Sequence, residues 1–360
     1  MIKTLDIGGA EVLLVERLRQ TPRAGLAYSV VFMQAATDEL VDVLRGAGVT
    51  VVDLRNCPRW LRYARLVRAV RRLAPDVVNV HSPSLAAVLR PFVRLMRPRP
   101  SLISTVHQEH ATRLAMLLDR PTRGLEDLMV AVSPQVARSR NVRGARRVCT
   151  RVHGVDVGKQ RYWAERAGQV RQEFSIPTDA FVLACVANLR PVKNHLLLID
   201  AASRVLASRP DALFALAGDG PLRGQVLAEI DRRGLRSRVR FLGRVPQANR
   251  LVAAADVLLL SSHSEGMPVV VMEAIAAGVP VVSTAVGGIP ELIHNNRNGI
   301  LTRPGSPEAL ADGILQAMRP EVYPVLAAGA LADAAKVDIS GTADWFHELY
   351  ANLTTDARRG

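Results

Sequence analysis

Cysteine and aromatic residues are scarce in this chain, and each scarcity excludes a class of function. The 360 residues include three cysteines, Cys57, Cys149 and Cys185, an odd number without the spacing of a metal site. A disulfide-stapled secreted fold is therefore not expected, and a reducing cytoplasm is the simplest compartment. Aromatic residues make up 4% of the chain, which leaves few rings to stack on bases, and no nucleic-acid-binding motif is present. We expect no nucleic-acid partner.

Long hydrophobic runs and a dinucleotide motif are also missing. No apolar run approaches the ~18 residues of a membrane-spanning helix, and no signal peptide is visible, so we expect a soluble or peripheral protein. The run GDGPLRG at 218–224 has its glycines one residue out of the G-x-G-x-x-G spacing. A dinucleotide cofactor is therefore not expected.

Acidic residues are few in the first part of the chain. Residues 1–152 contain 25 Lys plus Arg and 12 Asp plus Glu, a net charge of +13, whereas the remaining residues carry +1. Six of these arginines recur about every three residues: Arg59, Arg62, Arg65, Arg68, Arg71 and Arg72. Leucines and valines lie between them, with Trp60 and Tyr63 at the start, and this pattern predicts an amphipathic basic helix. One interpretation is peripheral contact with an anionic membrane through Arg59–Arg72, because each nearby cation contributes ~1 kcal/mol. The other is an ordinary solvated outer helix.

Apolar strand-like runs alternate with helical segments, and this pattern occurs twice. The first set is 27–33, 48–54, 76–82, 101–107, 127–133 and 147–154, and the second is 181–188, 212–218, 238–243, 255–262 and 279–284. The alternation predicts an α/β fold of two facing Rossmann-like, doubly wound domains. A polar stretch without periodicity separates the sets, so we expect domains at 1–155 and 179–335 and a linker at 156–178. Ligands bind at the carboxyl ends of such strands, so facing domains would form a cleft.

Two glutamates, Glu265 and Glu273, stand eight positions apart in the segment SEGMPVVVMEAIAAGVPVVST at 264–284. Pro268 suits the first position of a helix, and 269–277 is predicted to be a short helix. Its N-terminus offers backbone N–H groups and the positive end of a dipole, which suit a diphosphate. Carboxylates accept strongly from sugar hydroxyls, so the two glutamates around this helix start predict a nucleotide-sugar site.

This E-x7-E element, together with VGGIPELI at 286–293, resembles the donor-binding domain of the retaining glycosyltransferases of family 4, which have the GT-B fold. The resemblance covers roughly 180–310 through VANLRPVKN (186–194), LAGDGPLR (216–223), FLGRV (241–245) and NGILTRPG (298–305). The first half is similar more loosely, through LDIGGAE (5–11), PDVVNVHS (75–82), STVHQEH (104–110), VAVSPQVA (130–137) and HGVD (153–156). The resemblance implies that a last helix, here 336–360, crosses back to the first domain.

The resemblance also assigns residues on the donor side. It implies that Lys193 binds the diphosphate, Glu265 the sugar hydroxyls and Glu273 the ribose hydroxyls. Further donor-site residues are the turn Gly266, Met267, Pro268 and Val269, and the base-pocket residues Gly218, Gly220 and Arg244. The arginine that the family has five positions before the lysine is Asn188 here. Either Arg190 supplies that charge, or Asn188 holds the phosphate as a neutral donor. An ordinary loop lysine and a plain strand-end turn are the alternatives.

In the first domain, Gly8 and Gly9 resemble the glycine loop that lets backbone approach the phosphates. His107 matches the histidine that faces the donor sugar, and His81 is expected to face the acceptor; His110 and His153 are weaker candidates. His107, Lys193 and Glu265 are thus the expected catalytic residues. A hydrogen-bonded structural histidine is the alternative for each imidazole.

The resemblance implies transfer of a hexose-like unit from a nucleoside diphosphate sugar to the hydroxyl of an acceptor glycan or glycolipid, such as a cell-envelope or exopolysaccharide precursor. No two aspartates are spaced as D-x-D, the pair that metal-dependent sugar transferases commonly use, so we expect no metal and no cofactor beyond the donor. Two alternatives stay open: a degenerate nucleotide-sugar-binding protein, and another GT-B enzyme such as a sugar phosphorylase or epimerase.

The start of the chain carries a separate expectation. Only four residues precede LDIGGAE, whereas the first strand of a doubly wound sheet is central and paired on both sides. We expect a start upstream that adds at least ~5 apolar residues, a strand being ~5–6 residues long. Without them, neighbouring strands should keep unpaired N–H and C=O groups, and the chain should fold poorly or be weakly active.

Overall fold

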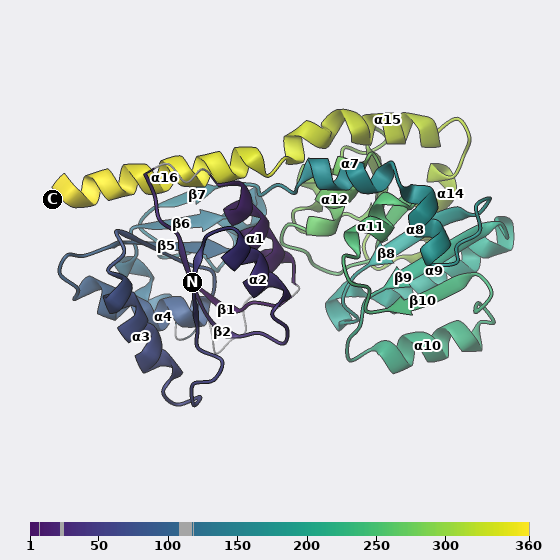
Figure 1. The fold of residues 1–360 in the computed structure, drawn as a ribbon. Coiled ribbons are helices and arrows are strands. Elements are labelled where there is room, and N and C mark those ends of the chain that lie inside the picture. The colour runs from purple at the N-terminus through teal and green to yellow at the C-terminus, as the bar shows by residue number, and fades with distance from the viewer. Residues whose placement is uncertain (7, 22–24, 108–116, 118, 360) are drawn as a thin grey trace. The chain divides into compact units, whose positions relative to one another are not determined.

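The computed structural model describes residues 1–6, 8–21, 25–107, 117 and 119–359, and it divides into two compact units. The first unit is Met1–Gly154 together with Ile339–Gly360, and the second unit is Val155–Asp338. Helices flank parallel strands in both units (Figure 1). The α/β class that the alternating pattern predicts is confirmed.

The first unit contains, in chain order, β1 (Ile2–Thr4), α1 (Gly9–Gln20), β2 (Ser29–Gln34), α2 (Glu39–Gly46), β3 (Thr50–Asp53), α3 (Arg62–Leu73), β4 (Val77–Val80), α4 (Pro83–Arg94), β5 (Ser101–Val106), η1 (Arg120–Leu125), β6 (Leu128–Ala131), α6 (Pro134–Arg138), β7 (Val148–Thr150) and α16 (Ser340–Arg359). β1, β2 and β3 form one sheet, and β4 to β7 form another. Met1 joins the two sheets, because its amino group donates to the Asn79 carbonyl at 2.6 Å and its carbonyl accepts from the His81 N–H at 2.8 Å. The strand order across this join is that of a doubly wound sheet.

The start of the chain makes backbone bonds on both sides, through β1 on one side and through Met1, just before β1, on the other. Ile2 lies opposite Phe32 and Thr4 opposite Gln34 of β2, while Met1 bonds to β4 on the other side. The expectation of unpaired backbone groups beside this segment is therefore wrong for these pairs.

The second unit contains α7 (Val157–Ala164), α8 (Ala167–Glu173), β8 (Phe181–Val186), η2 (Pro191–Lys193), α9 (His195–Ser208), β9 (Ala212–Ala217), α10 (Arg223–Arg232), β10 (Val239–Gly243), α11 (Asn249–Ala253), β11 (Val257–Leu260), α12 (Val269–Ala277), β12 (Val281–Thr284), α13 (Ile289–Leu292), β13 (Gly299–Thr302), α14 (Pro307–Ala317), α15 (Tyr323–Asp333) and η3 (Ala334–Val337). Its six strands pair in parallel in the order β10-β9-β8-β11-β12-β13. The chain connections of a doubly wound sheet reverse direction at its centre, here between β8 and β11. β13 lies outside the predicted strand runs, because this four-residue strand begins on a glycine.

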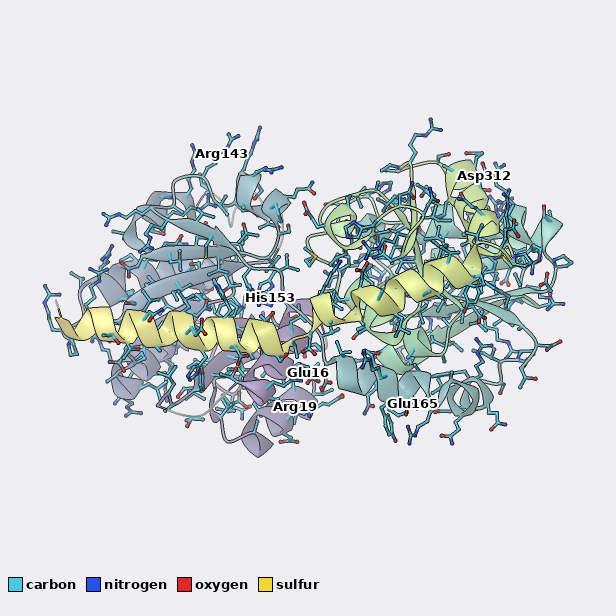
Figure 2. All side chains as sticks on the ribbon, turned by 90° about the horizontal axis from the view of Figure 1, so that it is seen from above. Glu16, Arg19, Arg143, His153, Glu165 and Asp312 are labelled. Carbon is cyan, nitrogen blue, oxygen red and sulfur yellow. The ribbon has the colours of Figure 1, made fainter. Side chains whose placement is uncertain are left out.

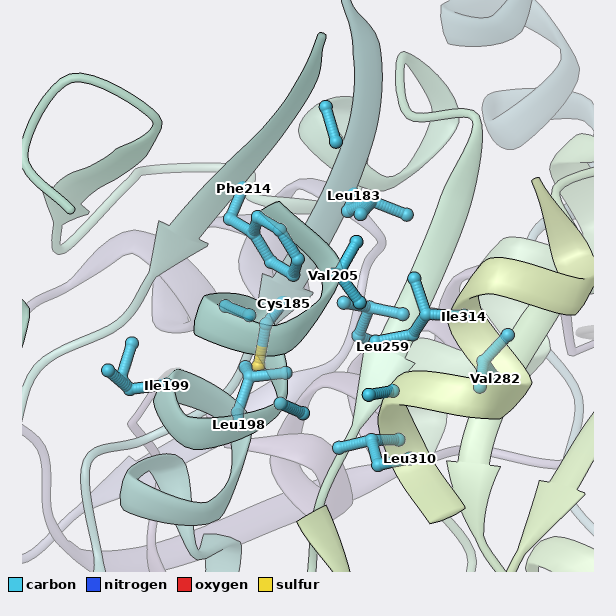
Figure 3. Packing of buried hydrophobic residues seen from close by; sticks show 14 of the residues in the cluster. Leu183, Cys185, Leu198, Ile199, Val205, Phe214, Leu259, Val282, Leu310 and Ile314 are labelled. Atoms are coloured by element: carbon cyan, nitrogen blue, oxygen red, sulfur yellow. The ribbon is translucent and has the colours of Figure 1, made fainter. Parts of the chain in front are cut away.

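Apolar side chains from both layers fill the core of the second unit. They come from β8, β9 and β11 on one side and from α9 and α14 on the other: Leu183, Cys185, Phe214, Leu259, Leu198, Val205 and Ile314 (Figure 3). Close packing of this kind fixes the strands and therefore the starting points of the loops that leave β8 and β11.

The residues expected as a linker, 156–178, instead form α7 and α8 within the second unit, and both helices contact α11. Asp156 is the N-cap of α7, and its carboxylate accepts from the Lys159 N–H at 2.9 Å. Arg171 of α8 donates to the Ala254 carbonyl at 2.8 Å. Each helix buries only one or two side chains, so neither produces an apolar period in the sequence.

The last helix packs on the first unit. α16 contacts α1, β4 and β5, and Figure 1 shows it in yellow along the strands of this unit. Phe346 is fully buried, with the Arg17 guanidinium 4.0 Å from its ring centroid. The Tyr350 hydroxyl accepts hydrogen bonds from Asn79 Nδ2 at 2.8 Å and from Arg17 at 3.3 Å. The end of the chain thus completes a core that residues near its start began.

His153 is buried beside α16 (Figure 2), with 2% of its surface exposed. Its ring meets Phe346 and His107 edge-on, at centroid distances of 5.7 and 5.5 Å. Neither ring nitrogen has a hydrogen-bond partner among the described residues. Burial lowers the pKa of His153 well below its ordinary value, and the charges of His107, Arg17 and Arg151 act in the same direction.

Acidification is expected to destabilise the protein through His153. Below pH ~6.5 the unfolded chain binds a proton at this ring that the folded chain does not, so the free energy of unfolding falls as pH falls and is unaffected at higher pH. His153→Phe should therefore recover about 1.4 kcal/mol at pH 5.5 relative to pH 8. Denaturant unfolding at both pH values measures this, with the exposed-histidine variant His294→Gln as control. An equal difference between wild type and His153→Phe at the two pH values would contradict the assignment.

Candidate functional site

Two loops of the second unit leave neighbouring strands at the point where the sheet reverses direction. β8 and β11 pair side by side, with Val257 opposite Leu183. The loop after β8 contains η2, and the loop after β11 leads into α12. Ligands of doubly wound sheets bind beyond the carboxyl ends of the strands at such a reversal. These two loops carry Lys193 and Glu265.

Lys193 and Glu265 form a bidentate ion pair. The Lys193 ammonium donates to Glu265 Oε1 at 2.6 Å and to Oε2 at 2.8 Å. The glutamate side chain is 8% exposed and the lysine side chain 23%. A carboxylate so far removed from water is stable only with a charged or hydrogen-bonding partner. Two residues that the sequence assigns to one site are therefore in direct contact.

Two serines, which the sequence analysis did not single out, hold the members of this pair. The Ser262 hydroxyl donates to Glu265 Oε1 at 2.5 Å. The Ser261 hydroxyl donates to the Lys193 carbonyl at 2.9 Å. The available signal was their position directly after a buried strand, three and four residues before the glutamate, where a short hydroxyl side chain can reach neighbouring loop atoms.

A pair of glycines holds the backbone of Glu265. Gly287 has a φ of +59°, and a Cβ atom there would lie 1.8 Å from the Glu265 carbonyl oxygen. The Gly288 N–H donates to the Gly266 carbonyl at 2.9 Å, and a Cβ at Gly288 would lie 2.3 Å from that oxygen. Both positions require glycine. The motif VGGIPELI thus contributes to the site through close backbone approach.

The predicted short helix has the predicted bounds, α12 at Val269–Ala277. Pro268 does not occupy its first position: it is the N-cap, with an extended ψ of 115°. A proline at the N-cap, like one at the first helical position, forfeits no hydrogen bond of the helix, because the first N–H groups have no partner within the helix. Gly266 and Met267 lead into this turn, and Met267 and Pro268 are buried. Glu273 is half-buried within α12.

The residues assigned to the diphosphate charge and the base pocket lie in the loops after β8, β9 and β10. Asn188, Arg190 and Arg244 are exposed there. Gly218 has a φ of +149°, and a Cβ atom on it would lie 2.0 Å from a backbone oxygen of the loop after β8. A Cβ on Gly220 would lie 2.6 Å from another oxygen of that loop. The close approach of the two loops explains both glycines, so their presence is not evidence of base binding.

In the first unit, His81 and His107 directly follow β4 and β5, and their rings share a hydrogen bond. His81 Nδ1 lies 3.0 Å from His107 Nε2, and the rings stack at 5.3 Å. Burial, with the charge of Arg17 second, lowers the pKa of His107 to about 4. Burial, with the charge of His107 second, lowers the pKa of His81 well below its usual value. At pH 7 both rings are therefore neutral, and one donates its N–H to the other. This bond links two residues for which the sequence predicted separate roles. His110 lies outside the described residues.

Gly8 is the N-cap of α1, and Gly9 is its first residue. A Cβ on Gly8 would lie 2.5 Å from Glu11 Oε2. Burial raises the pKa of Glu11, the bond to its own backbone N–H opposes this, and the charge of Asp6 adds to it. An anion approaching this helix start would therefore meet a carboxylate. Across the described ranges, no group of three or more His, Cys, Asp or Glu side chains is placed to hold a metal ion.

The basic helix predicted near the start of the chain is α3. Its exposed arginines, with Arg59 just before it, are Arg59, Arg65, Arg68, Arg71 and Arg72, here called the α3 arginine face. Trp60 beside them is 79% exposed. Arg62 belongs elsewhere, since it donates to the Cys57 and Arg55 carbonyls at 3.0 and 2.9 Å. No helix in the described part of the chain is long and apolar enough to cross a membrane.

Arginines on and near α10 of the second unit differ from the α3 arginine face in their partners. Arg232 of α10 and Arg233 after it both bind Glu229, and Arg236 binds Asp231. Within the described residues, no member of the α3 arginine face has an acidic partner, and the first turn of α3 contains no acidic residue. The acidic side chains that the structure describes therefore leave the positive charge of this face without a neutralising partner.

Known proteins match both units. The family described as "Glycosyltransferase Family 4" matches residues 7–167, and "Glycosyl transferases group 1" matches residues 168–326. N-acetyl-alpha-D-glucosaminyl L-malate synthase of Bacillus anthracis is 28% identical over 266 residues, which cover 72% of this chain and 69% of that protein. D-inositol 3-phosphate glycosyltransferase of Streptosporangium roseum is 29% identical, over 97% of this chain and 89% of that protein.

Solved structures share the fold. Anabaena Alr3699/HepE in complex with UDP and glucose superposes with a TM-score of 0.81 and 23% identity, covering 98% of this chain and 100% of that chain. The two family matches adjoin at residue 167 and together run from residue 7 to residue 326. The chain therefore belongs to the family 4 glycosyltransferases and has their GT-B fold.

Proposed function

We propose that this glycosyltransferase moves a hexose-like unit from a nucleoside diphosphate sugar to an acceptor hydroxyl with retention of anomeric configuration. The observation that carries the proposal is the Lys193–Glu265 pair, in the loops that leave β8 and β11 just before α12. An ammonium, a buried carboxylate and a helix N-terminus in neighbouring loops are suited to a diphosphate and to sugar hydroxyls. The complex of Anabaena HepE with UDP and glucose supports the same ligand class.

The proposed donor contacts divide by charge. Lys193 neutralises the leaving diphosphate, with exposed Arg190 as a second cation and α12 N–H groups as neutral donors. Glu265 accepts from the sugar hydroxyls and Glu273 from the ribose hydroxyls. Each acidic side chain thus meets hydroxyl donors, and each cation meets phosphate oxygens.

The reaction breaks the bond between the anomeric carbon and the diphosphate oxygen, whose electron pair stays on the diphosphate. A bond forms from the same carbon, on the same face, to the acceptor oxygen. The acceptor proton passes to the leaving phosphate oxygen and departs with the nucleoside diphosphate. His107 is our candidate for the first unit's contact with the sugar. It is neutral at pH 7 because its pKa is about 4, so it can hydrogen-bond without adding charge.

The proposed acceptor is a glycan or glycolipid hydroxyl presented at an anionic membrane. The α3 arginine face supports this, because its charges lack acidic partners in the described structure. Trp60, at 79% exposure, and the exposed Tyr63 are residue types that favour the membrane interface. We propose that the arginines of this face are attracted to anionic lipid headgroups and that Trp60 inserts between the headgroups.

Lys193→Ala and Glu273→Gln are each expected to reduce transfer by ~10²-fold or more, because each removes a charged donor contact. The donor is first identified by melting-temperature shift with a panel of nucleotide sugars, since a ligand that binds the folded state stabilises it. Glu308→Gln alters an exposed glutamate paired with Arg204 in the same unit and should retain wild-type turnover. Turnover near the wild-type value in both site variants would refute the assignment.

Transfer is expected to survive an excess of a strong chelator. The sequence contains no D-x-D pair, and we propose that Lys193 and helix N–H groups neutralise the leaving diphosphate in place of a metal. Initial rates with and without EDTA measure this. A rate that collapses in EDTA and returns with added Mg²⁺ or Mn²⁺ would show that the proposal is wrong.

The protein is expected to bind vesicles of anionic lipid more strongly than neutral vesicles, and binding should weaken with salt. Replacing Arg65, Arg68 and Arg71 by Gln should abolish the preference. The matched control replaces Arg232, Arg236 and Arg319 of the second unit by Gln, which removes the same charge from other exposed positions. Co-sedimentation with the vesicles measures binding. An equal loss of binding to anionic vesicles in both triple variants would show an effect of net charge alone and would exclude α3 as the contact.

A further inference from the structure

The Lys193–Glu265 pair puts a carboxylate on the cation that the diphosphate is proposed to bind. Both oxygens of Glu265 face the ammonium, at 2.6 and 2.8 Å, and Oε1 also accepts from Ser262. The lysine is therefore already neutralised by an internal anion. A diphosphate that approaches Lys193 must displace this carboxylate or share the ammonium with it.

We propose that Glu265 sets the enzyme's preference for the intact donor over the nucleoside diphosphate product, by competing with the diphosphate for Lys193. This inference rests on the proposed function and adds a specificity role to a residue proposed there only as a sugar contact. The competition has opposite consequences for the two ligands.

The intact donor compensates Glu265 for the loss of Lys193. Its sugar hydroxyls donate hydrogen bonds that a carboxylate accepts strongly, so Glu265 can turn from the ammonium to the sugar without losing its partners. Lys193 then becomes available to the diphosphate. Each group of the pair exchanges one partner for another.

The product offers no such compensation. A nucleoside diphosphate lacks the sugar, so displacing Glu265 from Lys193 leaves a carboxylate that is 8% exposed, and among the described residues the Ser262 hydroxyl is its remaining partner. Burying an unpaired carboxylate is costly, and two anions sharing one ammonium repel each other. After transfer, Glu265 is therefore expected to return to Lys193 and to weaken product binding.

The backbone prevents Glu265 from withdrawing. Gly287 and Gly288 pack against the backbone oxygens of Glu265 and Gly266, where a Cβ atom would lie 1.8 and 2.3 Å away. The Ser262 carbonyl accepts from the Thr284 hydroxyl at 2.7 Å. The loop is thus anchored at two points, and the carboxylate can change partner only by rotating its side chain. This keeps it within reach of both the ammonium and a bound sugar.

Calorimetric titration of wild type and Glu265→Gln with UDP, GDP and ADP tests the proposal. Gln keeps the size of the side chain and an acceptor for Ser262, but it removes the charge that competes for Lys193. The best-binding diphosphate is expected to bind Glu265→Gln at least ~10-fold more tightly than wild type, while its sugar conjugate gains less or loses affinity. Glu308→Gln, with the same charge change at an exposed position, should leave both affinities unchanged.

A second comparison separates competition for Lys193 from general repulsion. In a Lys193→Met background the carboxylate has no ammonium to contest, so Glu265→Gln should tighten diphosphate binding much less than in wild type. If Glu265→Gln fails to fold, Glu265→Asp replaces it, since the shorter side chain pulls the carboxylate away from Lys193 and should give a smaller tightening.

The outcomes are distinguishable. If wild type binds a diphosphate and Glu265→Gln binds it equally or more weakly, the inference is overturned and the proposed function stands. An equal gain for the diphosphate and its sugar conjugate also overturns it, because the preference would not depend on Glu265. Absence of binding by any of the three diphosphates to wild type and variant would overturn the proposed function as well.

Discussion

A carboxylate removed from water and paired with a lysine constrains much of the second unit. Glu265 requires Lys193, and the two residues follow different strands, so β8 and β11 must be neighbours for the pair to form. The doubly wound strand order provides that neighbourhood at its centre. Two serines and a glycine pair then fix the loops in which the charges stand. Sheet order, loop chemistry and glycine placement are thus linked through one ion pair.

The two units supply different chemistry. The site loops of the second unit present charged groups, Lys193 and Glu265. Directly after two strands of the first unit lie His81 and His107, whose pKa values burial lowers, with the charge of Arg17 acting in the same direction. Arg17 contacts the Phe346 ring and the Tyr350 hydroxyl. A buried guanidinium in such surroundings disfavours a second positive charge nearby, so the hydrogen bond between the histidines connects neutral rings.

The sequence predicted elements wherever an apolar period was strong. The bounds of α12 were predicted to the residue, because a proline precedes this apolar helix and a glycine with a φ of +75° ends it. α7 and α8 were missed because they bury few side chains, and β13 because a four-residue strand starting at glycine has no detectable alternation. Local pattern carries little information about elements that tertiary contacts stabilise.

The sequence named candidate residues of the site but not the contacts between them. The family resemblance assigned Lys193 and Glu265 to one site, but the bond between them depends on which strands are neighbours. His81 and His107 were assigned singly, since a hydrogen bond between two strand ends has no signature along the chain. Arg62 was grouped with the other arginines of the predicted basic helix by its spacing, although its guanidinium donates to the Cys57 and Arg55 carbonyls. The roles of all the candidate site residues, Lys193 and Glu265 included, remain predictions.

The return of α16 to the first unit bears on how the protein is made. The residues that bury Phe346 are synthesised early, but Phe346 follows the whole second unit, Val155–Asp338, in the chain. At translation rates of roughly 5–20 residues per second, the partly built first unit waits about 10 to 40 seconds for this side chain. During that interval Arg17 and Asn79 lack their contacts with Tyr350. The second unit, contiguous in sequence, can close its core first, so maturation of the first unit is set by the release of the last helix.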